Sequence, residues 1–320
     1  MTIGKSIRVF LADATVTGIR YAELVNWTGQ AIACPRNRLN ELQSWPEASK
    51  PGVYFLFESR FADIKPIAYV GESENVCKRL TTHDRSKEFW SEVVIFTSKD
   101  ENLTKAHIKY LESSLAALSL RADRYQLENG NTPTESSLPR ADQDAMEEFI
   151  ENVRMVLGIL GYSILEPLLK SKQPPIPSSS SGIRLEDENR YNDLIFTVNN
   201  LTAHGAATDE GFVLKKGSQL SKTNTESIPG KLVKTKERLL KDGALIDDGG
   251  KLIVTEDILL SSSSYAAAIV AGTSRSGPQS WKDAVTGQTM KQIEDSSFEA
   301  AMRSLEAEAL EVDKLVGKTQ

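Results

Sequence analysis

Gly52-Val53-Tyr54-Phe55-Leu56-Phe57 is an unbroken run of small and apolar residues, and Ile67-Ala68-Tyr69-Val70-Gly71 follows it after a short polar connection. Both runs are short, rich in β-branched and aromatic residues, and placed beside Pro or Gly, which predicts two β-strands. Val93-Val94-Ile95-Phe96 predicts a third strand. Helical patterns are mixed irregularly with these strands, which favours an α+β domain over a doubly wound parallel sheet.

Three segments around these strands show helical spacing. The clearest runs from Leu103 to Leu120, where Ile108, Leu111, Leu115 and Leu118 form one apolar stripe. The other two predicted helices are Glu74 to His83 and Gln143 to Leu160.

The rest of the chain suggests further divisions. Alternating segments before the first run predict a small β segment over residues 1–46, and the α+β domain with its following helix then covers 47–169. Prolines and four consecutive serines predict a linker over 170–184. A separate mixed α/β domain is expected over 185–292, and a charged amphipathic tail over 293–320.

Local patterns within the second domain predict its main elements. Leu232 to Lys241 is expected to be a helix, and a hairpin is expected around Asp247 to Gly250. Ser261 to Ser264 leads into small apolar residues and is interpreted as the N-cap of a helix over Ser263 to Ala271. Trp281 is expected to be a core residue, with a base-stacking platform as the alternative.

Composition sets broad limits on function. The chain has 320 residues, is 40% hydrophobic and 26% charged, and carries a formal net charge of −6. It has no apolar run of the length that a membrane helix needs and no signal-peptide core, and its two cysteines, Cys34 and Cys77, form no disulfide framework. We therefore expect a cytoplasmic protein with no membrane partner. The negative charge argues against a nucleic-acid partner unless a local basic surface overrides it.

Several polar residues occupy positions that suit phosphate chemistry. Glu112 borders the apolar stripe of its helix, where a carboxylate is costly unless it is paired or bound to a cation. Arg79 and His83 lie one helical turn apart beside apolar neighbours, and an arginine held there suits phosphate binding. Each has a simpler alternative: a surface glutamate, an exposed arginine with a buried stem and, for Tyr54 and Tyr69, packing in neighbouring strands.

Taken together, these residues resemble the GIY-YIG nuclease family in order and spacing, over about Pro51 to Pro133. The resemblance implies that Glu112 is the acidic ligand of a divalent metal, Mg²⁺ or Mn²⁺. It implies that Arg79 contacts the scissile phosphate, and that Tyr54 and Tyr69 are the two active-site tyrosines, one of which activates the attacking water.

Further positions follow from the same resemblance. Asn129 matches the asparagine that closes the motif, although Asn131 lies close enough to compete, and His83 and Lys105 are auxiliary candidates. The family's repair-type members often carry lysine after the second motif's glycine, whereas this chain has Glu72. A direct phosphate contact from that position is therefore in doubt.

The function that the resemblance implies is metal-dependent endonuclease activity on DNA, in restriction, phage defence or repair. The alternative is a catalytically silent nucleic-acid-binding or assembly protein with the same fold, and RNA cleavage also stays open. Segments such as Lys216-Gly217-Ser218 and Gly277 to Trp281 resemble an uncharacterised domain often attached to such nucleases. The chain holds one set of motif residues, so cutting both strands requires a homodimer or two binding events; Phe298, Met302 and Leu305 supply a candidate dimer contact.

Overall fold

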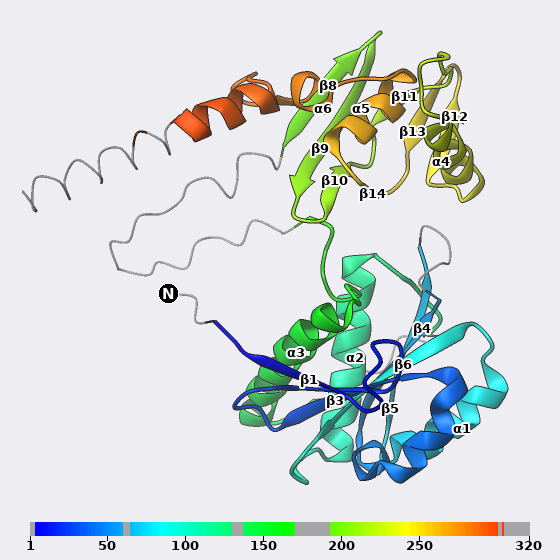
Figure 1. Cartoon of the computed structure of the whole chain (residues 1–320), viewed down its shortest axis with the longest axis vertical. Helices are drawn as coiled ribbons and strands as arrows, with labels where there is room; N and C mark the ends of the chain where they lie inside the picture. Colours follow the sequence, from blue (N-terminus) through cyan, green and yellow to red (C-terminus); the bar gives the residue numbers. More distant parts are fainter. Residues whose placement is uncertain (1–3, 60–64, 130–136, 170–192, 300–302, 304–320) are drawn as a thin grey trace, which may run out of the picture. The chain divides into compact units, whose positions relative to one another are not determined.

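The computed structural model describes residues 4–59, 65–129, 137–169, 193–299 and 303 (Figure 1). The chain divides into two units, residues 1–167 and 168–320, and each is described by itself. The division falls just before the predicted linker at 170–184, which lies outside the described residues, as does most of the predicted tail. The expected fold class, α+β with a separate C-terminal sheet domain, is confirmed.

Seven strands of the N-terminal unit form one sheet in the order β1-β2-β3-β6-β4-β5-β7. The three strands predicted from the central motifs lie next to each other, and the strands of the predicted β segment extend the same sheet because β3 pairs antiparallel with β6. The bounds are β1 (Ile7–Leu11), β2 (Arg20–Leu24), β3 (Gly29–Pro35), β4 (Gly52–Glu58), β5 (Ile67–Ser73), β6 (Trp90–Ser98) and β7 (Gln126–Leu127).

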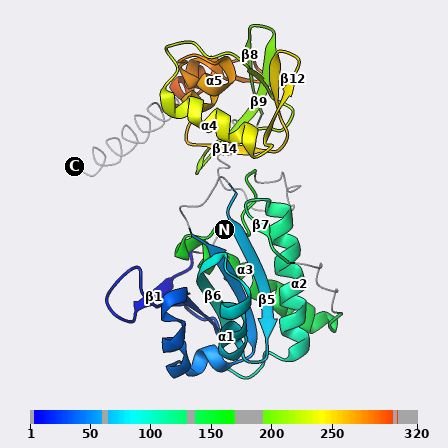
Figure 2. The same ribbon diagram turned by 90° about the vertical axis from the view of Figure 1, so that its right-hand side faces the viewer.

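This sheet is covered on both faces, which explains why β4 is apolar from Gly52 to Phe57. Alternate residues of β4 enter different cores: Phe55 packs beneath α2 (Lys105–Ala122) and α3 (Arg140–Leu160), and Tyr54 lies on the other face with α1 (Val76–Ser86). The 3₁₀ helices η1 (Arg36–Ser44) and η2 (Pro46–Ser49) complete that second layer. The α1 and α2 helices thus lie on opposite sides of the sheet (Figure 2).

The predicted helices form where their caps and apolar stripes place them. The side chain of Asn75 caps α1 by accepting from the Lys78 N–H, and Thr104 caps α2 by accepting from the His107 N–H. On α2 the predicted stripe faces the core: Ile108, Leu111 and Leu115 are buried, and Leu118 is partly buried. The stripe therefore fixes the rotation of α2 about its axis, and with it the position of the polar residues at the border of the stripe.

The C-terminal unit contains a five-stranded sheet, β14-β10-β9-β8-β15, and a three-stranded sheet, β11-β13-β12. The predicted helix, hairpin and capped small-residue helix are all present. The bounds are β8 (Leu194–Val198), β9 (Leu201–Thr208), β10 (Gly211–Leu214), β11 (Gln219–Ser221), α4 (Gly230–Lys241), β12 (Leu245–Asp248), β13 (Lys251–Val254), β14 (Ile258–Leu260), α5 (Ser263–Ala271), α6 (Gly277–Ser280) and β15 (Lys282–Asp283).

Trp281 is the centre of this unit's aromatic packing, as expected of a core residue. It is fully buried, with its ring 4.5 Å from that of Phe212 and 5.6 Å from that of Phe196, and its Nε1 donates to the Ser263 carbonyl at 2.9 Å. In the predicted dimer segment Phe298 is exposed, while Met302 and Leu305 lie outside the described residues. Within the described parts of the chain, every helix is too short or too polar to cross a membrane.

Candidate active site

Two glycines let the central strands approach each other and the tyrosine rings. Tyr54 on β4 lies opposite Gly71 on β5. A Cβ atom at Gly71 would lie 2.5 Å from the Tyr54 hydroxyl and 2.8 Å from Cε1 of Tyr69, so the Tyr54 ring occupies the space that a side chain would need. A Cβ at Gly52 would collide with the Phe96 carbonyl oxygen on β6. The glycines of both sequence motifs are therefore required by packing at the strands that carry the tyrosines.

Tyr54 and His83 form a buried pair on the α1 side of the sheet. The Tyr54 hydroxyl lies 2.7 Å from His83 Nε2, and the two residues are 0% and 5% exposed. Burial raises the pKa of Tyr54 above its ordinary range, and burial lowers the pKa of His83 to about 4, with a further contribution from the positive charges of Arg79 and Lys87. Near neutral pH the pair is therefore an uncharged phenol beside an uncharged imidazole.

The hydrogen bonding of His83 is incomplete. Its Nδ1 atom is buried and has no hydrogen-bond partner among the residues that the structure describes. If Tyr54 donates its proton to Nε2, then Nδ1 must carry the ring hydrogen without a partner, which costs free energy. A buried polar group without a partner calls for an explanation, and a catalytic role or a bound ion is among those available.

Tyr69 lies beside this pair but is less buried. Its ring centroid is 6.2 Å from that of Tyr54 and 5.3 Å from that of His83. Burial raises the pKa of Tyr69, and the negative charge of nearby Glu112 raises it further. Lys87 Nζ lies 4.5 Å from the centroid of the Tyr69 ring, a cation–π contact that the sequence analysis did not predict. The sequence could have indicated this contact, because Lys87 follows His83 by four residues at the end of α1 and so lies on the same helical face.

Arg79 connects the tyrosines to solvent. It lies on α1 one turn before His83, as predicted, and the residue is exposed. The pKa of its guanidinium is raised, first by hydrogen bonding to Tyr54 and also by Tyr69, so the group lies beside both hydroxyls. A permanent cation with one side against the tyrosines and the other open to solvent is suited to binding a phosphate oxygen.

Glu112 completes the cluster from the α2 side. Its carboxylate accepts a hydrogen bond from the Glu72 backbone N–H, and its charge acts on Tyr54 and Tyr69. Burial raises the pKa of Glu112 to about 7, and the neighbouring Glu72 carboxylate adds to the rise, while Arg79 opposes it. The positive charge near Glu112 therefore does not balance its ionised carboxylate. A bound cation would supply the missing positive charge.

The donor set suits a hard divalent cation with few protein ligands. The described residues contain no group of three or more His, Cys, Asp or Glu side chains placed to hold a metal. Glu112, with Glu72 beside it, still fits Mg²⁺ or Mn²⁺, because Mg²⁺ commonly binds through one or two carboxylates and fills its remaining positions with water and substrate phosphate.

Asn129 has a different place from the other predicted residues. Its side-chain amide makes two hydrogen bonds to the Val70 backbone, accepting from the N–H at 3.1 Å and donating to the carbonyl at 2.8 Å. Along the same outer edge of β5, the Glu128 N–H donates to the Ala68 carbonyl and Glu112 accepts from Glu72. Asn129 thus continues the parallel pairing of β7 with β5, the strand that carries Tyr69. It holds this strand at Val70, two residues before Glu72, which Glu112 contacts.

Five of the predicted residues are brought together: Tyr54, Tyr69, Arg79, His83 and Glu112. The auxiliary candidate Lys105 pairs instead with Glu74 at 2.9 Å on the surface. Asn131, the alternative to Asn129, lies outside the described residues.

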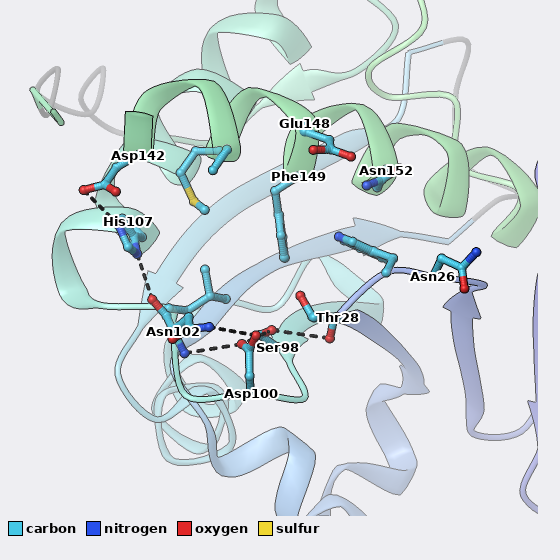
Figure 3. Close-up of a pocket in the computed structure, with 14 residues that line it drawn as sticks. Asn26, Thr28, Ser98, Asp100, Asn102, His107, Asp142, Glu148, Phe149 and Asn152 are labelled. Atoms are coloured by element: carbon cyan, nitrogen blue, oxygen red, sulfur yellow. Dashed lines mark hydrogen bonds and ion pairs between the residues drawn. The ribbon is translucent and has the colours of Figure 1, made fainter. Parts of the chain in front are cut away.

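A separate pocket of about 410 Å³ lies where α2 begins (Figure 3). His107 Nδ1 is 2.9 Å from the Asn102 carbonyl and its Nε2 is 3.8 Å from an Asp142 oxygen on α3, while Asp100 accepts from Ser98 and Asn102. These contacts tie the first turn of α2 to α3 and to the end of β6. We interpret this polar cluster as the support that fixes the start of the helix carrying Glu112.

Comparison with known proteins identifies one part of the chain. Residues 194–294 match the family model described as a domain of unknown function (DUF4357), close to the predicted bounds of 185–292. No curated protein matches the chain. No solved structure matches it either.

Proposed function

We propose that the N-terminal unit is a GIY-YIG-type endonuclease that hydrolyses phosphodiester bonds in DNA with the help of Mg²⁺ or Mn²⁺. The observation that carries the proposal is the convergence of a phosphate-binding cation, a perturbed carboxylate and a buried tyrosine–histidine pair on one part of the sheet. None of these residues is close to the others in sequence except Arg79 and His83. The pairing of β4 with β5 brings the two tyrosines together, but it does not require an arginine from α1 and a carboxylate from α2 to lie beside them.

The residues of the chain divide the chemical tasks between them. Glu112 would hold the metal, which would supply positive charge to the phosphate and to the departing oxygen. Arg79 binds a non-bridging phosphate oxygen and stabilises the charge that builds up in the transition state. Glu72 sets the affinity of Glu112 for a cation through its backbone N–H and its charge.

The attacking water loses its proton to one of the two tyrosines. Tyr69 is the more exposed of the two, and as a phenolate beside Arg79 it takes the proton from water, while Tyr54 stays neutral with its hydroxyl 2.7 Å from His83 Nε2. The new oxygen–phosphorus bond forms as the bond to the leaving oxygen breaks. Burial is the larger cause of the low pKa of His83 and the positive charge of Arg79 is the second, so His83 stays neutral beside Tyr54 near neutral pH.

We propose a DNA substrate and a cytoplasmic location, and a substrate panel tests the choice of substrate. Supercoiled plasmid and a structured RNA are incubated with the full chain, with and without Mg²⁺ or Mn²⁺, and compared with Glu112→Ala. Glu148→Ala, an exposed glutamate on α3, is the matched control. We expect metal-dependent cleavage of plasmid by wild type and by the control, with nicked circles before linear product, and none by Glu112→Ala. DNA binding without cleavage under every condition would instead identify a catalytically silent binding protein, and cleavage of RNA alone would change the substrate class.

A further inference from the structure

Four cations line the outer face of α4 in the C-terminal unit. Lys231, Lys234, Arg238 and Lys241 are separated by three, four and three residues, and this spacing places them on one side of a helix. All four are exposed. They form a basic stripe that runs along about 15 Å of the helix axis, at 1.5 Å per residue. We call this set the α4 stripe.

The α4 stripe is unpaired, in contrast to three other lysines of the same unit. Lys215 pairs with Asp193, Lys222 with Asp247 and Lys251 with Asp248. Within the described residues no stripe cation has an ion-pair partner, and Glu237, the single carboxylate inside the helix, pairs with none of them. The positive charge of the stripe is therefore left for something outside the unit to neutralise.

The opposite side of α4 fixes the stripe on the outside. Leu232 and Leu239 are buried in the core of the unit. Lys236 is also buried, and its Nζ donates to the Asn224 side chain at 3.0 Å and to the Ser221 carbonyl; burial lowers the pKa of Lys236 to about 8. With these three residues packed inward, the helix cannot turn the stripe toward its own unit.

We propose that the α4 stripe binds the phosphate backbone of nucleic acid without reading its sequence. Three of its four cations are lysines, which act as point charges. Phosphates recur about every 3.4 Å of helix axis along one strand, so an unpaired row about 15 Å long spans about four of them. A membrane surface is a poorer match, because an interfacial helix needs a free apolar face and that of α4 is buried in the unit. The stripe acts by binding alone and does not depend on the proposed nuclease chemistry.

Salt-dependent binding of the full chain to DNA tests this proposal. Fluorescence anisotropy with a short labelled duplex of mixed sequence is measured in EDTA over a range of salt concentrations, so that no cleavage is required. The stripe variant combines Lys231→Gln, Lys234→Gln, Arg238→Gln and Lys241→Gln. The control removes the same charge from exposed positions elsewhere in the unit, namely Lys216→Gln, Arg275→Gln, Lys282→Gln and Lys291→Gln.

We expect the stripe variant to bind more weakly and to lower the magnitude of the slope of log K against log salt by about 3.6, since each of four phosphate contacts contributes about 0.9. The control should change the slope by less than about 1. Equal behaviour of the stripe variant and wild type, or equal losses in both variants, would overturn the proposal. Stripe-dependent binding to phosphatidylserine vesicles without stripe-dependent binding to DNA would also overturn it. Circular dichroism confirms that each variant is folded.

Discussion

Replacing Glu112 with glutamine is expected to change how stability depends on pH. The pKa of this carboxyl is raised in the folded protein from an ordinary 4.5 to about 7, first by burial and then by Glu72. A group whose pKa is higher in the folded state contributes stability that is present below the unfolded-state pKa and is lost as the pH rises through the folded-state pKa. Wild type should therefore lose stability between about pH 4.5 and pH 7. Glutamine carries no proton to lose, so the variant should not.

The size of this effect follows from the two pKa values. The difference between 4.5 and about 7 converts to about 3 kcal/mol at roughly 1.4 kcal/mol per pH unit. Glu112 is partly exposed, and solvent screening reduces the figure. We expect Glu112→Gln to be about 1–3 kcal/mol more stable than wild type at about pH 8.5 and equal to it at about pH 4.5, apart from a pH-independent difference in side-chain contacts.

Urea unfolding followed by tryptophan fluorescence measures this directly. Trp27, Trp45 and Trp90 lie in the N-terminal unit, so its unfolding dominates the signal. The titration is done in EDTA, with Glu148→Gln as the matched control, and the high-pH point is repeated with Mg²⁺, which should stabilise wild type and leave Glu112→Gln unchanged. If the free energies of unfolding of wild type and Glu112→Gln differ by the same amount at every pH, then the pKa of Glu112 is not raised by burial and the reasoning is refuted.

Three further predictions concern the surrounding residues. His83→Gln should slow single-turnover DNA cleavage by about 10²-fold, because the Tyr54 hydroxyl loses the Nε2 atom that holds it at 2.7 Å; an unchanged rate would exclude a role for the Tyr54–His83 pair. Gly71→Ala should lower the melting temperature, since the added Cβ would lie 2.5 Å from the Tyr54 hydroxyl, and an unchanged melting temperature would show that the ring can move aside. Asn129→Ala should speed hydrogen exchange at the Val70 amide, which loses its acceptor; undiminished protection would contradict the role of Asn129 as a strand support.

Much of the fold was predictable because its signals are local. The run Gly52 to Phe57 is apolar without alternation, and the structure buries this strand on both faces. Helix α5 begins and ends where its serine cap and small residues predict. The joining of the N-terminal strands to the central sheet was not predicted, because the pairing of β3 with β6 links segments far apart in sequence and no local pattern records it.

The candidate site shows the same limit. Motif order predicted that Tyr54, Tyr69, Arg79 and Glu112 belong together, and the structure gathers them. Motif order did not predict that Glu112 accepts from the Glu72 backbone N–H. That contact depends on which part of β5 has no neighbouring strand. The support that Asn129 gives to Val70 was missed for the same reason.

The most direct test of the proposed function is the cleavage of supercoiled plasmid by wild type and by Arg79→Gln in Mg²⁺ or Mn²⁺. Arg79 is exposed on α1, so the substitution should leave the fold intact while it removes the fixed charge beside both tyrosines. The account predicts that wild type nicks the plasmid and that Arg79→Gln does so at least about 10²-fold more slowly. Nicking by both proteins at the same rate, or by neither under any metal condition, would contradict it.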